Sequence, residues 1–237
     1  MNIVGHRGAS GAELENTQRA FSVADEMGAD GVELDVRIAS DGRGGQRLVV
    51  FHNPLPHDQV AIDALPSFDE ILDACGERML INVEIKNSDD EGGHDPTMAV
   101  VPPTIAAMHR RGPNWANRWL ISSFSRSTVD HCRLVGPGFP TALLVYAATD
   151  EAIAHLANGG HSAIHPAVEG LDAERVEACH RAGLAVNAWT CNDPQRIAEL
   201  AAIGIDGVCT DVPDIALEAL RRSASDPDLT PMWGRPA

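Results

Sequence analysis

The clearest pattern in the sequence is a short run at residues 31–37 in which apolar and acidic side chains alternate. This two-residue repeat predicts a β-strand with Glu33 and Asp35 on one face and aliphatic residues on the other. Two neighbouring carboxylates that leave water repel each other and lose hydration, each at a cost of several kcal/mol or more. We therefore expect a positive charge to lie beside them.

Strand-like runs recur along the whole chain. They are predicted at residues 3–6, 31–37, 79–86, 119–123, 141–145, 162–165, 184–189 and 207–210. Helix-like segments separate them, around residues 17–27, 67–75, 97–111, 126–135, 150–158, 172–182, 193–203 and 213–222. This alternation predicts the α/β class and a single (β/α)8 TIM barrel over residues 1–222. Residues 223–237, which contain three prolines, are predicted to form a flexible tail.

Helix boundaries follow from local signals. Asn16 is the predicted N-cap of the first helix. Ser67 and Glu70 have the spacing of a capping box. The Pro102-Pro103 pair is expected to break the helix that ends near residue 111. One internal repeat supports a recurring unit, because residues 28–35 and 204–211 are identical at five of eight positions.

Residues 38–52 are predicted to form a hairpin excursion after the second strand. The polar, glycine-rich residues 40–45 read as its turn. If the chain folds back near residues 43–44, residue 52 lies about opposite residue 35. His52 would then lie beside the carboxylates of the second strand.

Polar side chains gather where the first three strands end, which is the active face of a TIM barrel. They are His6, Arg7, Glu33, Asp35, His52, Glu84 and Lys86. Three carboxylates with no neighbouring thiolate suit a hard divalent cation, Mg²⁺ or Ca²⁺, with Mn²⁺ as a further possibility. The alternative is a buried network of ion pairs without a metal.

The remaining groups of this face fit an anionic phosphate. Arg7 and Lys86 can hold a phosphate and neutralise its charge. His6 and His52 can supply the proton that leaves and the proton that enters, each worth about 10²–10⁴ in rate. Together these residues indicate phosphoester cleavage without a nucleophile from the protein.

The composition of the chain limits the kinds of binding partner and the cellular location that can be expected. The 237 residues carry a net charge of −16, which argues against nucleic acid or an anionic membrane as a resident partner. Five scattered cysteines without a C-x-x-C pair favour reduced thiols. The start of the chain has no leader pattern and no apolar run is long enough to span a bilayer, so a soluble, cytoplasmic protein is expected. Most of the remaining histidines are expected on the solvated surface, although His165 ends a strand and can approach the site.

The motifs, taken in order, resemble those of the glycerophosphodiester phosphodiesterases. The matching segments are His6-Arg7-Gly8, Glu15-Asn16-Thr17, residues 31–36, His52, residues 65–72, residues 82–86, Ser122-Ser123-Phe124, Ala188-Trp189-Thr190 and residues 207–211. They span nearly the whole chain. The resemblance implies a metal-dependent TIM-barrel enzyme that hydrolyses a small-molecule phosphodiester to glycerol 3-phosphate and an alcohol.

The resemblance also implies roles for single residues. His6 and His52 match the acid/base pair, Glu33, Asp35 and Glu84 the metal ligands, and Arg7 and Lys86 the phosphate contacts. Glu15 matches a carboxylate of the substrate-binding site, either on the metal side or in support of the residues that bind the metal. Phe124 and Trp189 match the apolar wall of the glycerol pocket, with ordinary core aromatics as the alternative.

Two departures from the family pattern affect substrate choice. Asn53 stands where the family usually has an aspartate after the second histidine, so His52 can be oriented differently. Only residues 54–66 fill a gap that is commonly longer, which predicts a more open active face.

Three functions therefore remain open. A lysophospholipid is an alternative substrate, and a non-catalytic protein that binds glycerol phosphate is an alternative to an enzyme. For the enzyme, attack by the neighbouring glycerol hydroxyl, through a cyclic phosphate, competes with attack by water. The native metal, the order in which the histidines act and the oligomeric state are not set by the sequence.

Overall fold

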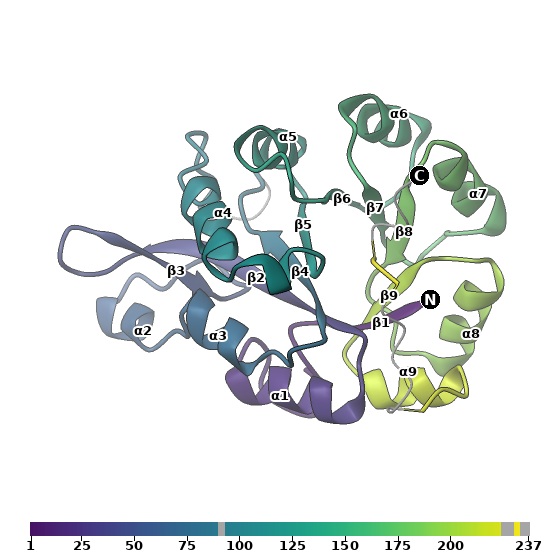
Figure 1. The fold of residues 1–237 in the computed structure, drawn as a ribbon, viewed down its shortest axis with the longest axis horizontal. Coiled ribbons are helices and arrows are strands. Elements are labelled where there is room, and N and C mark those ends of the chain that lie inside the picture. Colours follow the sequence, from purple (N-terminus) through teal and green to yellow (C-terminus); the bar gives the residue numbers. More distant parts are fainter. Residues whose placement is uncertain (90–92, 224–229, 233–237) are drawn as a thin grey trace.

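A computed structural model describes residues 1–89, 93–223 and 230–232. Within these ranges eight parallel strands, in the order β1-β9-β8-β7-β6-β5-β4-β2, form a sheet that the pairing of β1 with β2 closes into a TIM barrel (Figure 1). The strands are β1 (Asn2–Gly5), β2 (Gly31–Ser40), β4 (Leu80–Ile85), β5 (Trp119–Ser123), β6 (Thr141–Val145), β7 (Ala163–Pro166), β8 (Ala185–Ala188) and β9 (Gly207–Thr210). The predicted fold is confirmed, with strand ends that differ by few residues from those expected.

Helices surround the barrel. They are α1 (Gln18–Met27), α2 (Gln59–Asp63), α3 (Phe68–Ala74), α4 (Val101–Arg110), α5 (Arg126–Val135), α6 (Asp150–Gly159), α7 (Ala173–Arg181), α8 (Pro194–Ala202) and α9 (Pro213–Ala219), with a 3-10 turn η1 (Pro113–Trp115). The short helix α2 was not predicted, because residues 54–66 have no clear helical repeat of apolar positions.

Some helix ends differ from the sequence predictions. The predicted capping box is present, with the Ser67 hydroxyl accepting from the Glu70 N–H and the Glu70 carboxylate accepting from the Ser67 N–H. Helix α1, however, is capped by Thr17 and not by Asn16. The predicted break in α4 is wrong, because both prolines lie in its first turn, where a missing N–H costs nothing.

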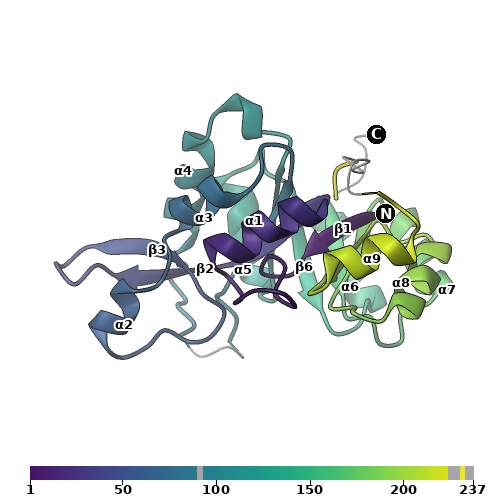
Figure 2. The ribbon, with the colours of Figure 1, turned by 90° about the horizontal axis from the view of Figure 1, so that it is seen from below.

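The excursion after β2 is a hairpin formed with β3 (Gln46–Val50), and it extends away from the barrel with α2 beside it (Figures 1 and 2). Its register pairs Val36 with Val50, so residue 51 and not residue 52 lies opposite Asp35, one residue from the prediction. Val36 pairs with Ile85 of β4 on its other edge. The hairpin therefore places β3 on the edge of β2 that also pairs with β1, and β4 pairs with the opposite edge.

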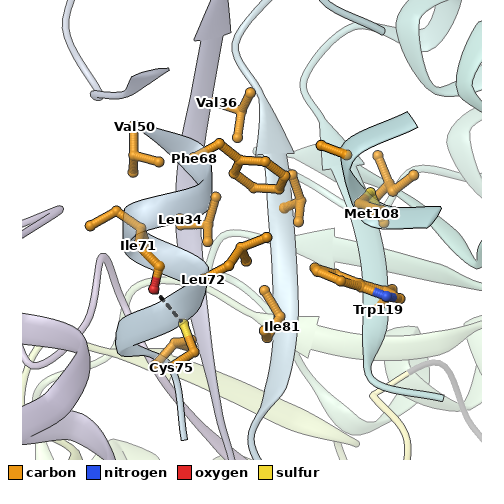
Figure 3. Packing of buried hydrophobic residues seen from close by; sticks show 14 of the residues in the cluster. Leu34, Val36, Val50, Phe68, Ile71, Leu72, Cys75, Ile81, Met108 and Trp119 are labelled. Carbon is orange, nitrogen blue, oxygen red and sulfur yellow. Dashed lines mark hydrogen bonds between the residues drawn. The ribbon is translucent and has the colours of Figure 1, made fainter. Parts of the chain in front are cut away.

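The aliphatic face of β2 packs outward against the helices. Figure 3 shows Phe68 and Leu72 of α3 over Leu34, Val36 and Ile81 of the neighbouring strands, all of them within one buried cluster. Burying one such side chain contributes roughly 1.5–3 kcal/mol to stability. Since this outward face carries the hydrophobic core, the alternate positions of β2 are left to point into the barrel.

The base of the barrel is closed by a residue from the end of the described chain. Met232 is buried among Val4, Leu80 and Leu120, and its carbonyl oxygen accepts a hydrogen bond of 2.7 Å from Asn187 Nδ2. The predicted tail at 223–237 lies largely outside the described residues, which include only 223 and 230–232 of it. All five cysteines are free thiols.

Candidate active site

A cavity of about 330 Å³ opens at the ends of the barrel strands. All of the predicted site residues except Asp35 and Glu15 line it: His6, Arg7, Glu33, His52, Glu84, Lys86, Phe124 and Trp189. Side chains from six segments of the sequence therefore share one volume, as expected for the carboxyl-terminal face of a TIM barrel.

The three predicted metal ligands form one buried group. Register places Asp35 of β2 beside Glu84 of β4, and Glu33 beside Asn82. One oxygen of each of Glu33, Asp35 and Glu84 lies within 4.8 Å of the other two. Burial, together with the charges of Asp35 and Glu84, raises the pKa of Glu33 well above its usual value. Without a cation, this arrangement resists full ionisation.

Arg7 and Lys86 are paired with these carboxylates. Lys86 Nζ lies 2.7 Å from Glu84 Oε1 and 3.7 Å from Asp35 Oδ1. The Arg7 guanidinium lies 3.3 Å from Asp35 Oδ2, and it donates to Glu15 at 2.8 Å. The ion-pair network considered from the sequence is therefore present, and Glu15, which lies outside the cavity lining, positions Arg7.

These ion pairs leave negative charge and oxygen atoms that a divalent cation can bind. Arg7 and Lys86 bring two positive charges against the three negative charges of the buried carboxylates. Among the described residues, Glu33 Oε1, Asp35 Oδ1 and Asn82 Oδ1 are buried oxygens without a hydrogen bond. Since an unsatisfied buried oxygen is costly and hard cations prefer oxygen ligands, the residues fit Mg²⁺ or Ca²⁺. Asn82, a neutral oxygen donor, was not predicted as a site residue.

The loop after β1 fixes the backbone around this group. Arg7 and Asn16 both adopt left-handed backbone conformations, with φ of 55° and 57°. The Arg7 N–H donates to Glu33 Oε2 at 3.0 Å, and Asn16 Nδ2 donates to Asp35 Oδ2 at 2.8 Å. Asn16 is thus a buried partner of the site and not a helix cap, and a positive φ at asparagine leaves no mark in the local sequence pattern.

His6 is held by a carboxylate that the sequence analysis did not include in the site. His6 Nδ1 lies 2.7 Å from Asp211 Oδ1, beyond the end of β9. Ser10 and Asn192 also donate to Asp211, and the hydrogen bond with His6 is the main reason why the pKa of Asp211 lies well below its usual range. Asp211 corresponds to Asp35 in the internal repeat, and that correspondence was the available signal.

His52 has a different environment. It is partly exposed, and its Nδ1 lies 3.3 Å from Asn53 Oδ1, a neutral amide. Burial is the main cause that lowers its pKa below the ordinary imidazole value, with Asp35 opposing the shift. His6 and His52 therefore differ, because His6 has a carboxylate partner and His52 has an amide.

An aromatic wall completes the cavity. Phe124 and Trp189 pack edge to face, with ring centroids 5.3 Å apart. Tyr146, which was not predicted, lies 5.7 Å from Phe124 and 5.8 Å from Trp189, and 73% of its surface is exposed. The apolar surface thus extends from inside the cavity to solvent.

Two further histidines are buried: His165, which was expected to be able to approach the site, and His161, which belongs to the group expected mostly on the surface. His165 lines the cavity, contacts Asn187 at 3.0 Å and has its pKa lowered to about 3 by burial. His161 lies on the outside of the barrel wall, between α5 and α6, and only 1% of its side chain is exposed. A lone histidine in a loop gives no sequence signal that separates these cases. No helix among the described residues has the length and apolar character needed to cross a bilayer.

Comparison with known proteins places this chain in a family. The model of the glycerophosphoryl diester phosphodiesterase family matches residues 6–55 and 46–215. A glycerophosphodiester phosphodiesterase of Caldanaerobacter subterraneus is 25% identical over 248 residues, which cover 93% of this chain and 98% of the relative. Uncharacterized protein YqiK of Bacillus subtilis is 29% identical, with coverage of 92% and 98%.

Solved structures share the fold. A phosphodiesterase from Oleispira antarctica, in complex with the product sn-glycerol-3-phosphate, superimposes with a TM-score of 0.77 at 22% identity, covering 93% of this chain and 97% of that one. A glycerophosphodiester phosphodiesterase from Thermotoga maritima gives a TM-score of 0.73 at 23% identity, with coverage of 94% and 98%. The chain therefore belongs to the glycerophosphoryl diester phosphodiesterase family, whose members are phosphoric diester hydrolases.

Proposed function

We propose that this protein hydrolyses glycerophosphodiesters to glycerol 3-phosphate and an alcohol, with a divalent cation held by Glu33, Asp35 and Glu84. One observation carries the proposal: a single cavity brings together a buried group of carboxylates, two cationic side chains, and His6 and His52, whose environments differ. The name of the Caldanaerobacter relative and the product bound to the Oleispira structure point to the same substrate class.

The cationic side chains are proposed to bind the phosphate. When bound, Mg²⁺ or Ca²⁺ would neutralise the carboxylates and polarise a phosphoryl oxygen. That neutralisation weakens the hold of the carboxylates on Arg7 and Lys86, so their donors can turn toward phosphate oxygens. Glu15 keeps the Arg7 guanidinium in place through the hydrogen bond of 2.8 Å. Phe124 and Trp189 would cover the carbon face of the glycerol.

The two histidines are proposed to divide the proton transfers. Burial favours the neutral form of His52, so His52 accepts the proton of the attacking hydroxyl, whether water or the neighbouring glycerol hydroxyl. His6, which the Asp211 carboxylate holds through its Nδ1 at 2.7 Å, would donate a proton to the leaving alkoxide as the P–O bond breaks. If water attacks directly, His52 then gives its proton to solvent and His6 takes one up. If the glycerol hydroxyl attacks, His6 removes a proton from the water that opens the cyclic phosphate, and His52 returns its proton to the glycerol oxygen.

The test is release of glycerol 3-phosphate from glycerophosphocholine and glycerophosphoethanolamine. We expect release to stop with chelator and to return with Mg²⁺ or Ca²⁺. His6→Ala and His52→Ala should each lower kcat by about 10²–10⁴. His57→Ala, which removes an exposed histidine from the segment that follows the hairpin, is the matched control and should keep wild-type activity.

Two results would contradict the proposal. Full activity of either catalytic variant would remove the assigned acid/base roles. Binding of glycerol 3-phosphate without any turnover at saturating Mg²⁺ and Ca²⁺ would instead support a non-catalytic binding protein.

A lysophospholipid is the second candidate substrate, and the exposed ring of Tyr146 favours it, because an apolar wall that continues into solvent can support an acyl chain. Comparing a lysophospholipid with glycerophosphocholine in wild type and Tyr146→Ala decides between them. A loss of kcat/KM that is confined to the lysophospholipid would support this second candidate. The cytoplasmic location stays a prediction, which fractionation of the native host would test.

A further inference from the structure

A second group of possible metal ligands lies on the outside of the barrel, at the end opposite the active face. It consists of Asp130 on α5, His155 on α6 and His161, two residues before β7 begins. One ligand atom of each lies within 4.8 Å of the others. The proposed phosphodiesterase reaction uses none of these residues, so their convergence needs its own explanation.

Within this group, the Asp130 carboxylate lies near an imidazole nitrogen of each histidine. Asp130 Oδ1 lies 2.9 Å from His161 Nε2 and 3.4 Å from His155 Nε2. His155 Nε2 is buried and makes no hydrogen bond among the described residues, although it points at a carboxylate. The two imidazole rings stack with centroids 5.9 Å apart. A single carboxylate oxygen thus faces two imidazole nitrogens at once.

His161 is held in place from behind. The ring nitrogen Nδ1 of His161 lies 2.8 Å from Thr141 Oγ1. The backbone N–H of His161 donates to Leu156 O at 3.0 Å. Metal-bound imidazoles usually donate their second N–H to an oxygen, which fixes the ring and leaves the other nitrogen free to bind. If Thr141 Oγ1 accepts from Nδ1, then His161 Nε2 and Asp130 Oδ1 are both acceptors. A cation between them would remove the resulting repulsion.

Glycines at the end of α6 make the approach possible. A Cβ on Gly159 would come within 2.7 Å of the His161 ring, and Gly160 adopts the left-handed conformation, with φ of 68°, that turns the chain back under α6. Neither position can carry an ordinary side chain without moving His161 or straining the turn. The local backbone is therefore built to bring His161 against α5 and α6.

The surrounding charges are mixed. Arg133, one turn after Asp130, opposes a cation at this place. Glu151, one turn before His155, favours it, although Glu151 also pairs with Arg126. The net charge of −16 attracts cations to the molecule as a whole. The half-exposed carboxylate of Asp130 gives an ion an entry path from solvent.

From this geometry we propose that Asp130, His155 and His161 form a second metal site, for Zn²⁺ or a similar transition metal. Two imidazoles and a carboxylate are typical ligands of Zn²⁺, with water in the fourth position. In a tetrahedral site with bonds of about 2.0–2.1 Å, ligand atoms are about 3.4 Å apart. The two separations from Asp130 Oδ1, 2.9 and 3.4 Å, differ from this value by at most about 0.5 Å, and the ligand atoms of the two histidines lie within 4.8 Å of each other. The ion would join α5, α6 and the start of β7, and so stabilise the outer layer of the barrel.

The test is a calorimetric titration of the untagged, full-length protein with ZnCl₂, with Mg²⁺ in excess to occupy the acidic group of the active site. We expect one Zn²⁺ per chain with micromolar or tighter affinity, and a higher melting temperature with the metal. His155→Ala and Asp130→Asn should each weaken binding by about tenfold or more. Both residues are partly exposed, whereas replacing the buried His161 risks the fold.

The matched control is His180→Ala, which removes another histidine paired with an aspartate, His180 Nε2 to Asp206 at 2.8 Å. It should leave the Zn²⁺ affinity unchanged, and all three variants should keep wild-type phosphodiesterase activity with Mg²⁺. X-ray absorption at the zinc edge should show two imidazoles in wild type and one in His155→Ala. Equal affinity in wild type, His155→Ala and Asp130→Asn would overturn the site, and so would binding that requires millimolar Zn²⁺.

Discussion

The pair formed by His6 and Asp211 can be tested by one substitution, Asp211→Asn, which keeps the shape of the side chain and removes its charge. In the wild type, Asp211 Oδ1 faces His6 at 2.7 Å and also accepts from Ser10, while Oδ2 accepts from Asn192 Nδ2. An amide can accept hydrogen bonds on only one of these two sides, because its other terminal atom is a nitrogen that donates. If its oxygen stays toward His6, its NH₂ group meets the NH₂ group of Asn192, and the opposite orientation turns a donor toward His6.

The second orientation is expected, because two opposed NH₂ groups cannot bond to each other. It forces His6 Nδ1 to accept, which places the ring proton on the other nitrogen, and the substitution itself removes the negative charge that faces the ring. A hydrogen bond to a charged group contributes about 1.5–3 kcal/mol, or about 10- to 150-fold in rate. Complete loss of a positioned acid costs about 10²–10⁴. We therefore expect kcat to fall by about 10²-fold with little change in KM.

The assay is steady-state release of glycerol 3-phosphate at saturating metal. Ser10→Ala is the matched control, since it deletes another hydrogen bond to the same carboxylate oxygen without removing the charge, and it should cost only about fivefold. The melting temperature of both variants shows whether the fold is retained. A kcat for Asp211→Asn within about threefold of wild type would refute the positioning of His6 by Asp211.

Three further predictions concern pH and stability. If His52 acts as the base, activity should be lost as pH falls through its pKa, so the acid limb of kcat/KM should lie below the ordinary imidazole value of about 6.5, and His52→Ala should lose that limb. Because the pKa of His165 is about 3 when folded and about 6.5 when unfolded, its contribution to stability is complete above pH 6.5 and falls by roughly 1.4 kcal/mol per pH unit below it. In urea denaturation, the free energy of unfolding of wild type should fall more between pH 7 and pH 5 than that of His165→Gln. An equal fall in both proteins would exclude a buried neutral imidazole at position 165. Arg222→Ala should destabilise the protein by about 3 kcal/mol in the same assay, since it breaks a two-bond ion pair with the buried Asp30; a change under about 0.5 kcal/mol would mean that the pair contributes nothing.

The strands, the barrel and most of the site could be predicted because their signals are periodic or chemical. The alternation of Glu33 and Asp35 with aliphatic residues identifies both the strand and its inward face, and the structure shows those aliphatic residues packed under α3. The hairpin was predicted one residue out of register because its turn is glycine-rich and fits several fold-back points. His52 still reaches the cavity, since a residue just beyond the strand has freedom to turn.

The residues that escaped prediction act through contacts between distant segments. Asp211 looks like an ordinary polar residue at a strand end, and Asn82 like one within a strand, until the pairing of strands sets them beside His6 and Glu33. Asn16 fits the pattern of a helix cap, and only its left-handed backbone and its hydrogen bond to Asp35 give it another role. Tyr146 has an aromatic partner in Trp189, more than 40 residues away. Pairings of this kind depend on the tertiary fold and leave no local pattern.

The topology itself explains how two histidines so far apart in the sequence reach one cavity. β1 pairs with β2 only as far as Gly5 and Val32, and from Val36 onward β3 occupies the same edge of β2. The chain leaves β1 at His6 and returns from β3 at His52, so both imidazoles arrive on one side of the carboxylates. The other side is taken by β4, which supplies Glu84 and Lys86. In the proposed cleavage the attacking and leaving oxygens lie roughly in line at phosphorus, so a diester bound in the cavity would place one imidazole at each of these oxygens, with Arg7 and Lys86 at the remaining phosphate oxygens.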